Sequence, residues 1–405
     1  MAVCGSGQAA QWSIGNPSAD AQLYLEYINR SRADAIVEAN RLANETNSAI
    51  VSAYSYFGID RPDIVSQFQY YINSGAIAQN AQPLAFQPQL LQAAELHTQD
   101  LYQNQFQGHN SSSNPPAPFQ PGYSIGQRLA AVGYSGSAGE NVYSYSSSVR
   151  FGHAGFDVDW GNINNSGAPY YNPAFIDQGM QNPAGHRRNL HNPDYKEIGI
   201  GVINGTNGSV GPQLVTQDLG NPGSVRYITG VVYEDLNSNN FYDIGEGRSG
   251  VQIDVSGSAY YALSTASGGY AVPVNADGTY NVTFSGGSFA TFATTASVTG
   301  GRNVKVDYLA GAIAMLLGDY NQNGVVDAAD YVVWRKKLGS GTALPNDDTP
   351  GVGTDDYTRW RARFGNTHAG SGSGVGAAIP EPATIAMLVV AMGIVMNVRR
   401  RRDTI

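Results

Sequence analysis

The hydrophobic positions of the chain follow a helical period first and a strand period later. Over residues 19–44 and 88–106, apolar residues recur every three or four positions, which predicts amphipathic helices. A shorter helix is expected over residues 124–132, and the alternation in Glu197-Ile-Gly-Ile-Gly-Val-Ile203 predicts a strand. Helices and strands therefore mix in one α+β region over residues 19–222.

Residues 223–312 have a different pattern, in which apolar and polar residues alternate over short runs separated by Gly, Asn, Asp or Ser. Short strands at this spacing are typical of an all-β sandwich. The predicted strands cover residues 225–233, 250–255, 259–263, 269–274, 278–284 and 303–308.

The C-terminal end has three parts. Residues 367–378 form a Gly/Ser-rich linker, and Pro380-Glu381-Pro382 then opens an apolar run without charge as far as Val398. The 17 residues from Pro382 to Val398 would span roughly 25 Å as a helix, enough for a bilayer core. Arg399–Arg402 follow at once, which predicts a transmembrane helix with its end in the cytoplasm.

Composition narrows the class of protein. A length of 405 residues predicts several domains, and 49 Gly, 25 Tyr and 14% charged residues favour a loop-rich extracellular protein. The net charge of −9 argues against nucleic acid as a partner and is compatible with calcium. The single cysteine, Cys4, excludes an intramolecular disulfide. Residues 1–18 form a polar leader without a signal peptide, and our hypothesis is that Met1 is a mis-assigned or truncated start.

Two loops place oxygen-bearing side chains at positions one, three, five, nine and twelve, which is the spacing of an EF-hand calcium loop. One loop has glycine at position six and would bind calcium through Asp319, Asn321, Asn323, Val325, Asp327 and Asp330. The other has Asn240 at position six, where Asn can also adopt the left-handed conformation that a sharp turn needs, and it would use Asp235, Asn237, Asn239, Asp243 and Glu246. A solvated Asn/Asp turn is the alternative for this second loop.

An internal repeat accompanies the loop that begins at Asp319. Asp330-Tyr-Val-Val-Trp334 is matched 26 residues later by Asp356-Tyr-Thr-Arg-Trp360. Two loop–helix units of this kind would pack as a pair within residues 313–366, with Tyr and Trp in their common core. The second loop, residues 344–351, lacks the full oxygen spacing, so we expect one strong calcium site in this module and a weak or absent second one.

Candidate chemistry in residues 19–222 centres on His109, Glu140 and His186, each of which is next to a glycine. Two imidazoles and a carboxylate that converge can hold a divalent ion or a water. From residue types alone, the alternative is that these histidines serve turns and hydrogen bonds. His97 has apolar helical neighbours and is interpreted as a packed residue that supports the site and is not a ligand.

Seven short motifs, in order, resemble the CAP superfamily of cysteine-rich secretory, antigen 5 and pathogenesis-related proteins, in its bacterial branch. They are Ile28-Asn29-Arg30-Ser31-Arg32, Gln82-Pro-Leu84-Ala-Phe86, Ala93-Ala94-Glu-Leu-His97, Gly108-His109, Gly139-Glu140-Asn141, Gly185-His186-Arg187 and Ile198-Gly-Ile-Gly201. The resemblance implies an α-β-α sandwich with a cleft tetrad of two histidines and two acids, which can bind zinc or another divalent ion.

His109, Glu140 and His186 match three positions of that tetrad. The second acid does not transfer cleanly, because a long Asn/Gly/Pro insertion follows this region. Asp159 is the first candidate and Asp157 the second, and the alternative for both is a helix cap.

The remaining segments resemble three other families. Residues 223–312 resemble the B-type repeats of bacterial surface adhesins, residues 313–366 resemble a dockerin type I segment, and residues 379–405 resemble the PEP-CTERM sorting signal of exosortase systems. This last resemblance implies export, processing near Pro-Glu-Pro, transient membrane anchoring and transfer to the cell surface or matrix. The expected partners are exosortase-type sorting machinery, the membrane before processing, and envelope polysaccharide or lipid.

Three functions follow as hypotheses. The first is an exported cell-envelope CAP protein with a divalent-metal cleft and calcium-binding accessory modules. The second is a metal-dependent hydrolase of peptides, lipids or glycans that uses His109, Glu140, His186 and Asp159 to activate a water. The third is an adhesion or matrix-binding protein that acts through its β-sandwich.

Overall fold

A computed structural model describes residues 9–287, 289, 291–310, 316–321, 323–347 and 349–366. The chain forms two compact units that divide after Ala312. The predicted linker, the Pro-Glu-Pro motif and the transmembrane helix over residues 382–398 lie outside the described residues. Within the described ranges, no helix has both the length and the apolar character needed to cross a membrane.

The first unit begins with an α+β region. Its helices are α1 (Ala19–Ala33), α2 (Ala35–Ala43), α3 (Ser48–Phe57), α4 (Arg61–Asn73), α5 (Pro88–Asn104), α6 (Ile125–Ala131), α7 (Val149–Ala154) and α8 (Gly185–Leu190), with a π-helical turn η1 (Gly155–Asp159) and a 3-10 turn η2 (Pro173–Phe175). Its sheet has the order β2-β4-β5-β3, formed by β2 (Ala85–Phe86), β3 (Ser137–Ser146), β4 (Glu197–Asn204) and β5 (Gln213–Asn221).

The predicted helix over residues 19–44 is two helices because Asp34 interrupts it. Asp34 has an extended backbone, with φ −157°, and its carboxylate accepts hydrogen bonds from the amides of Ile36 and Val37. A short acidic side chain that satisfies the free amides of a first turn is a favourable N-cap. The chain therefore starts a new helix in a new direction at this residue.

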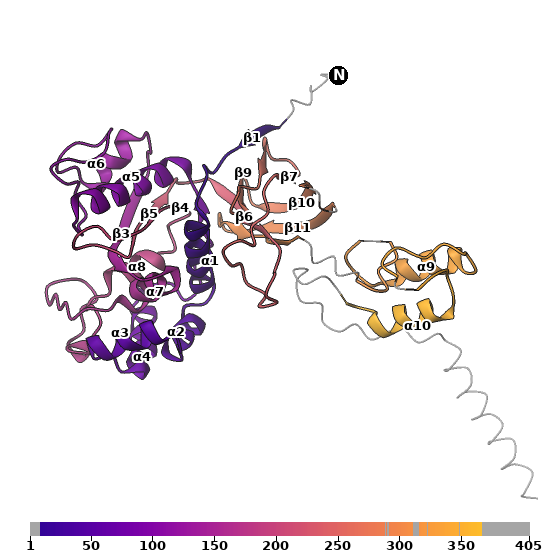
Figure 1. The fold of residues 1–405 in the computed structure, drawn as a ribbon, viewed down its shortest axis with the longest axis horizontal. Helices are drawn as coiled ribbons and strands as arrows, with labels where there is room; N and C mark the ends of the chain where they lie inside the picture. The colour runs from indigo at the N-terminus through magenta and orange to yellow at the C-terminus, as the bar shows by residue number, and fades with distance from the viewer. Residues whose placement is uncertain are drawn as a thin grey trace, which may run out of the picture. The chain divides into compact units, whose positions relative to one another are not determined.

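Strand β4 explains how the helices cover both faces of the sheet. A Cβ added at Gly199 would lie 2.0 Å from the backbone of Leu90, and one at Gly201 would lie 2.3 Å from the Ala94 carbonyl oxygen, so α5 packs directly on this face. Ile198 and Ile200 alternate with the glycines and point to the other face, where they pack with residues of α1. Helix, sheet and helix therefore form three layers (Figure 1).

The rest of the first unit is a β-sandwich. One sheet has the order β1-β8-β7-β10-β11, and the other contains β12, β6 and β13, with β9 paired to β6. The strands are β1 (Ala10–Trp12), β6 (Arg226–Tyr233), β7 (Val251–Val255), β8 (Tyr260–Leu263), β9 (Gly269–Val274), β10 (Gly278–Gly286), β11 (Phe292–Val298), β12 (Val304–Lys305) and β13 (Tyr308–Leu309). Apolar residues from both sheets form one buried cluster between them.

Three details of the sandwich differ from the sequence predictions. Within the expected leader, β1 pairs in parallel with β8, so the N-terminal segment completes a sheet of the sandwich. The strand expected over residues 303–308 is two short strands, because Asp307 accepts the Val231 amide through its side chain (3.0 Å) and interrupts the backbone pairing. Strand β11, rich in Ala and Thr, had no predicted counterpart.

The α+β region and the sandwich share a core. Tyr227, Val231 and Tyr233 of β6 belong to the same buried cluster as Tyr24 and Ile28 of α1. Polar contacts cross the same boundary: the Tyr227 hydroxyl donates to Glu197 at 2.5 Å, and Lys305 pairs with Glu26 at 2.9 Å. Because these apolar side chains are buried only when both parts are present, each part contributes to the stability of the other.

The second unit is a pair of helices, α9 (Ala328–Lys337) and α10 (Thr354–Arg363), whose contacts repeat with the 26-residue period. The indole of Trp334 donates to the carbonyl of Gly353 at 2.7 Å, and the indole of Trp360 donates to the carbonyl of Asp327 at 2.7 Å. Each tryptophan thus bonds the residue that caps the other helix. Both indoles are buried in one small cluster.

Helices α1, α2 and α7 are joined by a buried charge. The Glu38 carboxylate accepts hydrogen bonds from Arg30 at 2.9 and 2.6 Å, and its Oε1 lies 3.0 Å from His153 Nε2. Burial opposes ionisation of Glu38, but the hydrogen bonds from His153 and Arg30 outweigh it and lower the pKa of this carboxyl. Glu38 is therefore a charged, paired group in the interior of the domain.

The shared core predicts that residues 19–222 do not form a stable domain without the sandwich. A fragment ending at residue 222 exposes the apolar surface of α1 that β6 covers, so it should aggregate or melt well below a fragment of residues 9–310. Thermal unfolding followed by circular dichroism compares the two. Equal melting temperatures would show that the boundary near residue 223 separates independent folding units.

Substituting Glu38→Gln should lower the free energy of unfolding by about 3 kcal/mol at pH 7, because it leaves Arg30 and His153 without their buried partner. Since the pKa of Glu38 is lowered, its stabilisation is fully present above the ordinary carboxyl value of 4.5 and is lost as pH falls toward the lowered pKa. Urea unfolding at pH 7 and pH 3 should show a smaller difference between wild type and variant at pH 3.

The matched control is Glu234→Gln, which removes a half-exposed partner of Arg248 and should cost at most about 1 kcal/mol. A Glu38→Gln difference that is the same at both pH values would contradict the assignment of a lowered pKa to Glu38.

Candidate functional site

The first histidine–acid pair joins a loop to strand β3. His109 Nδ1 lies 2.9 Å from Glu140 Oε1, and the His109 side chain is 62% exposed whereas that of Glu140 is 2% exposed. Glu140 follows Gly139, where a Cβ would lie 2.5 Å from the Tyr195 hydroxyl, so only glycine allows β3 to approach this closely. The pair therefore places a buried carboxylate behind a solvent-facing imidazole.

Three further buried groups surround Glu140. Arg128 of α6 donates to Glu140 Oε2, and His97 of α5 lies 3.9 Å from the same oxygen. Burial opposes ionisation of Glu140, but the His109 hydrogen bond and the His97 and Arg128 charges outweigh it and lower its pKa. Asp218 of β5 lies opposite Glu140 in the sheet register, and its pKa is well above the ordinary value, through burial first and then the Glu140 charge.

The second pair joins the π-helical turn η1 to α8. His186 Nδ1 lies 2.7 Å from Asp159 Oδ1, and Asp159 Oδ2 accepts the His186 amide at 2.9 Å. Asp159 has a positive φ of 59°, which its short polar side chain tolerates better than most residues. Burial lowers the pKa of His186, but the charge and hydrogen bond of Asp159 outweigh it, so the pKa is raised.

Asparagines hold the two pairs on neighbouring segments. Asn189 of α8 donates to the carbonyl oxygen of Glu140 at 3.1 Å and to Asn141 Oδ1 at 2.9 Å. Asn141 in turn donates to the carbonyl oxygen of His186 at 3.4 Å. Asn141, which follows Glu140, thus contacts the backbone of His186 and brings β3 and α8 together at the candidate site.

The other candidate acid, Asp157, lies elsewhere. Its carboxylate accepts from the Ser31 hydroxyl at 2.5 Å and lies 2.9 Å from His191 Nε2, and all three side chains are fully buried. Asp157 therefore belongs to the interior of the domain, while Asp159 contacts the second histidine. The sequence prediction missed Asp218 and the role of Arg128; an acid in the middle of an otherwise buried strand, as in β5, is the signal that points to Asp218.

The two EF-hand-like loops share one hydrogen-bond scheme. In the loop of the second unit, Asp319 accepts the amides of Asn323 (3.1 Å) and Gly324 (2.9 Å). In the sandwich loop, Asp235 accepts the amides of Asn239 (3.1 Å) and Asn240 (2.8 Å), which are the same positions five and six. The side chain at position twelve accepts the amide at position nine in both: Asp330 from Asp327, and Glu246 from Asp243.

Position six has the left-handed backbone in both loops, with φ 84° at Gly324 and φ 58° at Asn240. The sequence prediction that Asn can replace glycine there is therefore confirmed for the backbone. Burial, and beyond it the negative charges of Asp319 and Asp327, raise the pKa of Asp330. A divalent cation would relieve this repulsion.

The second half of the repeat holds an arginine where its two acids meet. Arg359 Nη1 lies 2.7 Å from Asp347 Oδ1 and 2.8 Å from Asp356 Oδ1, and Thr349 donates to both carboxylates. Asp356 corresponds to Asp330 by the 26-residue offset. A guanidinium therefore neutralises these acids.

Among the residues that the structure describes, no group of three or more His, Cys, Asp or Glu side chains is arranged so that these groups alone could hold a metal ion. His109, Glu140, Asp159 and His186 are therefore not gathered into one such group, and the two loops would add amide and backbone oxygens to their carboxylates.

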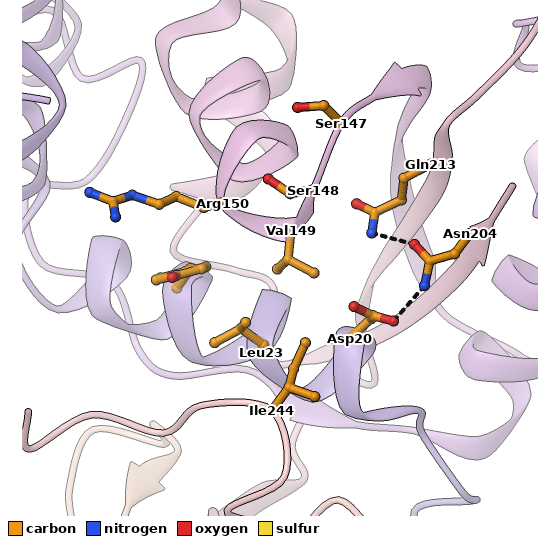
Figure 2. Close-up of a pocket in the computed structure, with 10 residues that line it drawn as sticks. Asp20, Leu23, Ser147, Ser148, Val149, Arg150, Asn204, Gln213 and Ile244 are labelled. Carbon is orange, nitrogen blue, oxygen red and sulfur yellow. Dashed lines mark hydrogen bonds between the residues drawn. The ribbon is translucent and has the colours of Figure 1, made fainter. Parts of the chain in front are cut away.

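A pocket of about 330 Å³ lies away from both histidine–acid pairs. Figure 2 shows its apolar side chains, Leu23, Val149 and Ile244, beside a hydrogen-bonded row in which Gln213 donates to Asn204 and Asn204 to Asp20, each at 2.8 Å. Ile244 belongs to the sandwich loop and Leu23 to α1, so the pocket is bounded by both parts of the first unit.

Loop residues fix this boundary. Phe241 stacks on Tyr27 of α1 with ring centroids 5.2 Å apart, Arg30 lies over Phe241 at 5.0 Å, and Tyr242 is buried in the shared core. Side chains of α1 therefore contact Phe241 of the sandwich loop, while the loop's own carboxylates accept its backbone amides.

Comparisons with known proteins agree with the motif order found in the sequence. Residues 25–219 match the model of the CAP family, described as the cysteine-rich secretory protein family. No curated protein shows a significant match to the chain.

Two solved structures are similar over part of the chain. An extracellular protein containing a SCP domain from Bacillus anthracis is 19% identical, with 39% of this chain and 38% of that chain covered and a TM-score of 0.24. A mutant type II cohesin–X-dockerin complex from Acetivibrio cellulolyticus is 19% identical, with 36% and 98% covered and a TM-score of 0.18. TM-scores this low support no inference about fold or function.

The family match confirms the resemblance predicted from the seven ordered motifs. The α+β region of the first unit, which carries both histidine–acid pairs, is a CAP domain of the cysteine-rich secretory protein family.

Proposed function

We propose that this protein is an exported cell-envelope protein whose CAP domain binds a divalent metal ion through His109 and His186. The observation that carries the proposal is the matching geometry of the two pairs: each ring directs Nδ1 at a buried carboxylate, at 2.9 and 2.7 Å. A histidine ligand usually donates its second ring nitrogen to a carboxylate in this way. Nε2 of each ring is then the atom that would bind zinc or a similar ion.

The geometry favours binding over hydrolysis. A metal-dependent hydrolase needs a general base that is free to take a proton from water. Glu140 is already bonded by His109 and Arg128, and Asp159 by the ring and amide of His186. Both acids therefore orient the imidazoles, and the bound metal would act as a structural or ligand-binding centre.

Calcium is the second part of the proposal. The loop that begins at Asp319 and the loop that begins at Asp235 would each take one calcium ion, because both combine oxygen side chains at EF-hand spacing with the left-handed turn at position six. In the other half of the repeat Arg359 already supplies positive charge, so no calcium ion is expected there.

Export and sorting rest on the sequence. Membership of the CAP family and the Pro-Glu-Pro tail with its apolar run and arginines support a secreted protein that exosortase-type machinery processes from a transient membrane anchor. Envelope polysaccharide or lipid is the partner expected at that location.

Titration with zinc tests the metal centre. Wild-type protein should bind one equivalent of zinc in the CAP domain, and His109→Ala or His186→Ala should each weaken binding at least about tenfold. Because a ligand histidine must be deprotonated and the pKa of His186 is raised, zinc affinity should fall as pH drops through that raised value.

His153→Gln is the control, since His153 contacts Glu38 and should leave zinc affinity unchanged. Unchanged affinity in both alanine variants would remove the proposed centre. Zinc-dependent turnover of peptides, lipids or glycans that is lost in Glu140→Gln would instead establish the hydrolase.

Calorimetric titration with calcium should give two sites in the full chain. Asp319→Asn and Asp235→Asn should each remove one of them, whereas Asp347→Asn should remove neither, because Arg359 neutralises that carboxylate. Calcium at about 100 times its dissociation constant should stabilise each of the two units, which hold one site each, by about 2.7 kcal/mol. Three sites, or loss of a site in Asp347→Asn, would contradict the assignment.

A further inference from the structure

The loop that carries His109 has no regular secondary structure, so other groups must fix its position. Between α5 and α6, two successive carbonyl oxygens are held by buried side chains: that of Gly108 lies 3.0 Å from His97 Nε2, and that of His109 accepts from Arg128 at 2.7 Å. His97 and Arg128 are both fully buried. The backbone of His109 is therefore clamped between two helices.

Arg128 also reaches the other member of the pair. Its Nη1 bonds the carbonyl oxygens of His109 and Tyr123, at 2.7 and 3.0 Å, while its Nη2 donates to Glu140 Oε2. The other oxygen of Glu140 is the one that contacts the His109 ring. One planar guanidinium thus fixes both the backbone of His109 and the carboxylate that faces its side chain.

We propose that Arg128 is a positioning residue that holds His109 as the Nδ1–H tautomer and so keeps Nε2 free for a metal ion. This inference rests on the proposed two-histidine centre. Glu140 must stay aligned as a hydrogen-bond acceptor for Nδ1–H to be favoured, and Arg128 supplies that alignment by holding the opposite oxygen.

Without this alignment the tautomer changes. A neutral imidazole in water prefers the proton on Nε2, and a hydrogen-bond acceptor at Nδ1 reverses the preference. An Nε2–H nitrogen has no lone pair with which to bind a metal ion. Loss of Arg128 therefore weakens metal binding without removing any ligand.

Lysine cannot replace this arrangement. Its ammonium is a compact point charge, whereas the arginine fork presents donors in a fixed plane that reach a carboxylate and two carbonyls at once. Arg128→Lys preserves the buried charge but loses the simultaneous contacts. This variant therefore distinguishes the effect of the buried positive charge from the effect of the guanidinium's hydrogen-bond geometry.

The test uses the full chain with Arg128→Met and Arg128→Lys. Arg150→Met is the matched control, because it removes an arginine–glutamate pair of the same domain, with Glu45 at 2.7 Å, that contacts neither histidine–acid pair. The first readout is the ¹⁵N spectrum of the histidine rings in metal-free protein, with His109 assigned by its absence in His109→Ala. The second is zinc affinity from competition with a chelator.

We expect Arg128→Met to move His109 toward the Nε2–H tautomer and to weaken zinc binding about 10- to 100-fold, the range for the loss of an outer-shell partner. Arg128→Lys should change both readouts in the same direction by a smaller factor, and Arg150→Met should change neither. If circular dichroism shows that Arg128→Met does not fold, the ring spectrum and zinc affinity of Arg128→Lys test the inference instead.

A wild-type ring spectrum and wild-type zinc affinity in folded Arg128→Lys would overturn the inference. If wild-type protein binds no zinc, the proposed metal centre is lost, but the ring spectra of the metal-free variants still decide whether Arg128 sets the tautomer.

Discussion

The CAP domain depends on carboxylates that are buried and must each have a partner. A charge moved out of water costs several kcal/mol unless an opposite charge or a set of hydrogen bonds replaces the lost solvent. Glu38, Glu140, Asp157 and Asp159 all lie in the interior, and each contacts a histidine. Since the partners come from different helices and strands, satisfying these four charges fixes how the elements pack.

This constraint links stability to the candidate metal centre. The pairs of Glu38 and Asp157 are closed to solvent, whereas the other two leave an imidazole at the surface, with His109 62% and His186 24% exposed. All four pairs join an imidazole to a carboxylate, but the two buried pairs use Nε2 and the other two use Nδ1. The ring nitrogen and the access to water together separate structural pairs from pairs that can take a ligand. Arg128 has both a structural role and a role at the candidate site: it balances the buried charge of Glu140, and it supports the carboxylate that faces the exposed His109 ring.

The sequence predicted local features well because they depend on neighbouring residues. The alternation of Ile and Gly in β4, the left-handed turn at Asn240 and the 26-residue repeat all appear in the structure. Which acid would reach His186 was harder to predict, since Asp157 and Asp159 are two residues apart. A π-helical turn, which the hydrophobic period does not indicate, directs Asp157 to His191 in the core and Asp159 to His186.

Contacts between distant segments were the least predictable. The shared core of α1 and β6, and the pairing of Asp218 with Glu140, join residues far apart in the chain, and no local spacing indicates them. Strand β1 also depends on a contact between distant segments. Its three residues lie in a segment with no strand pattern, and they form a strand because they pair with the edge strand β8. Whether such a segment forms a strand depends on its tertiary contacts, which the sequence of that segment alone does not indicate.

Arg359 has a consequence for how the helical repeat responds to its surroundings. A metal ion held by carboxylates leaves when its concentration outside falls, but a guanidinium is covalently part of the chain and always charged. The half of the repeat built around Asp347 and Asp356 therefore keeps its positive charge when metal ions are removed. Removal of the calcium ion proposed for the Asp319 loop would act on that half alone, and the crossed tryptophan bonds join that half to one whose charges stay balanced.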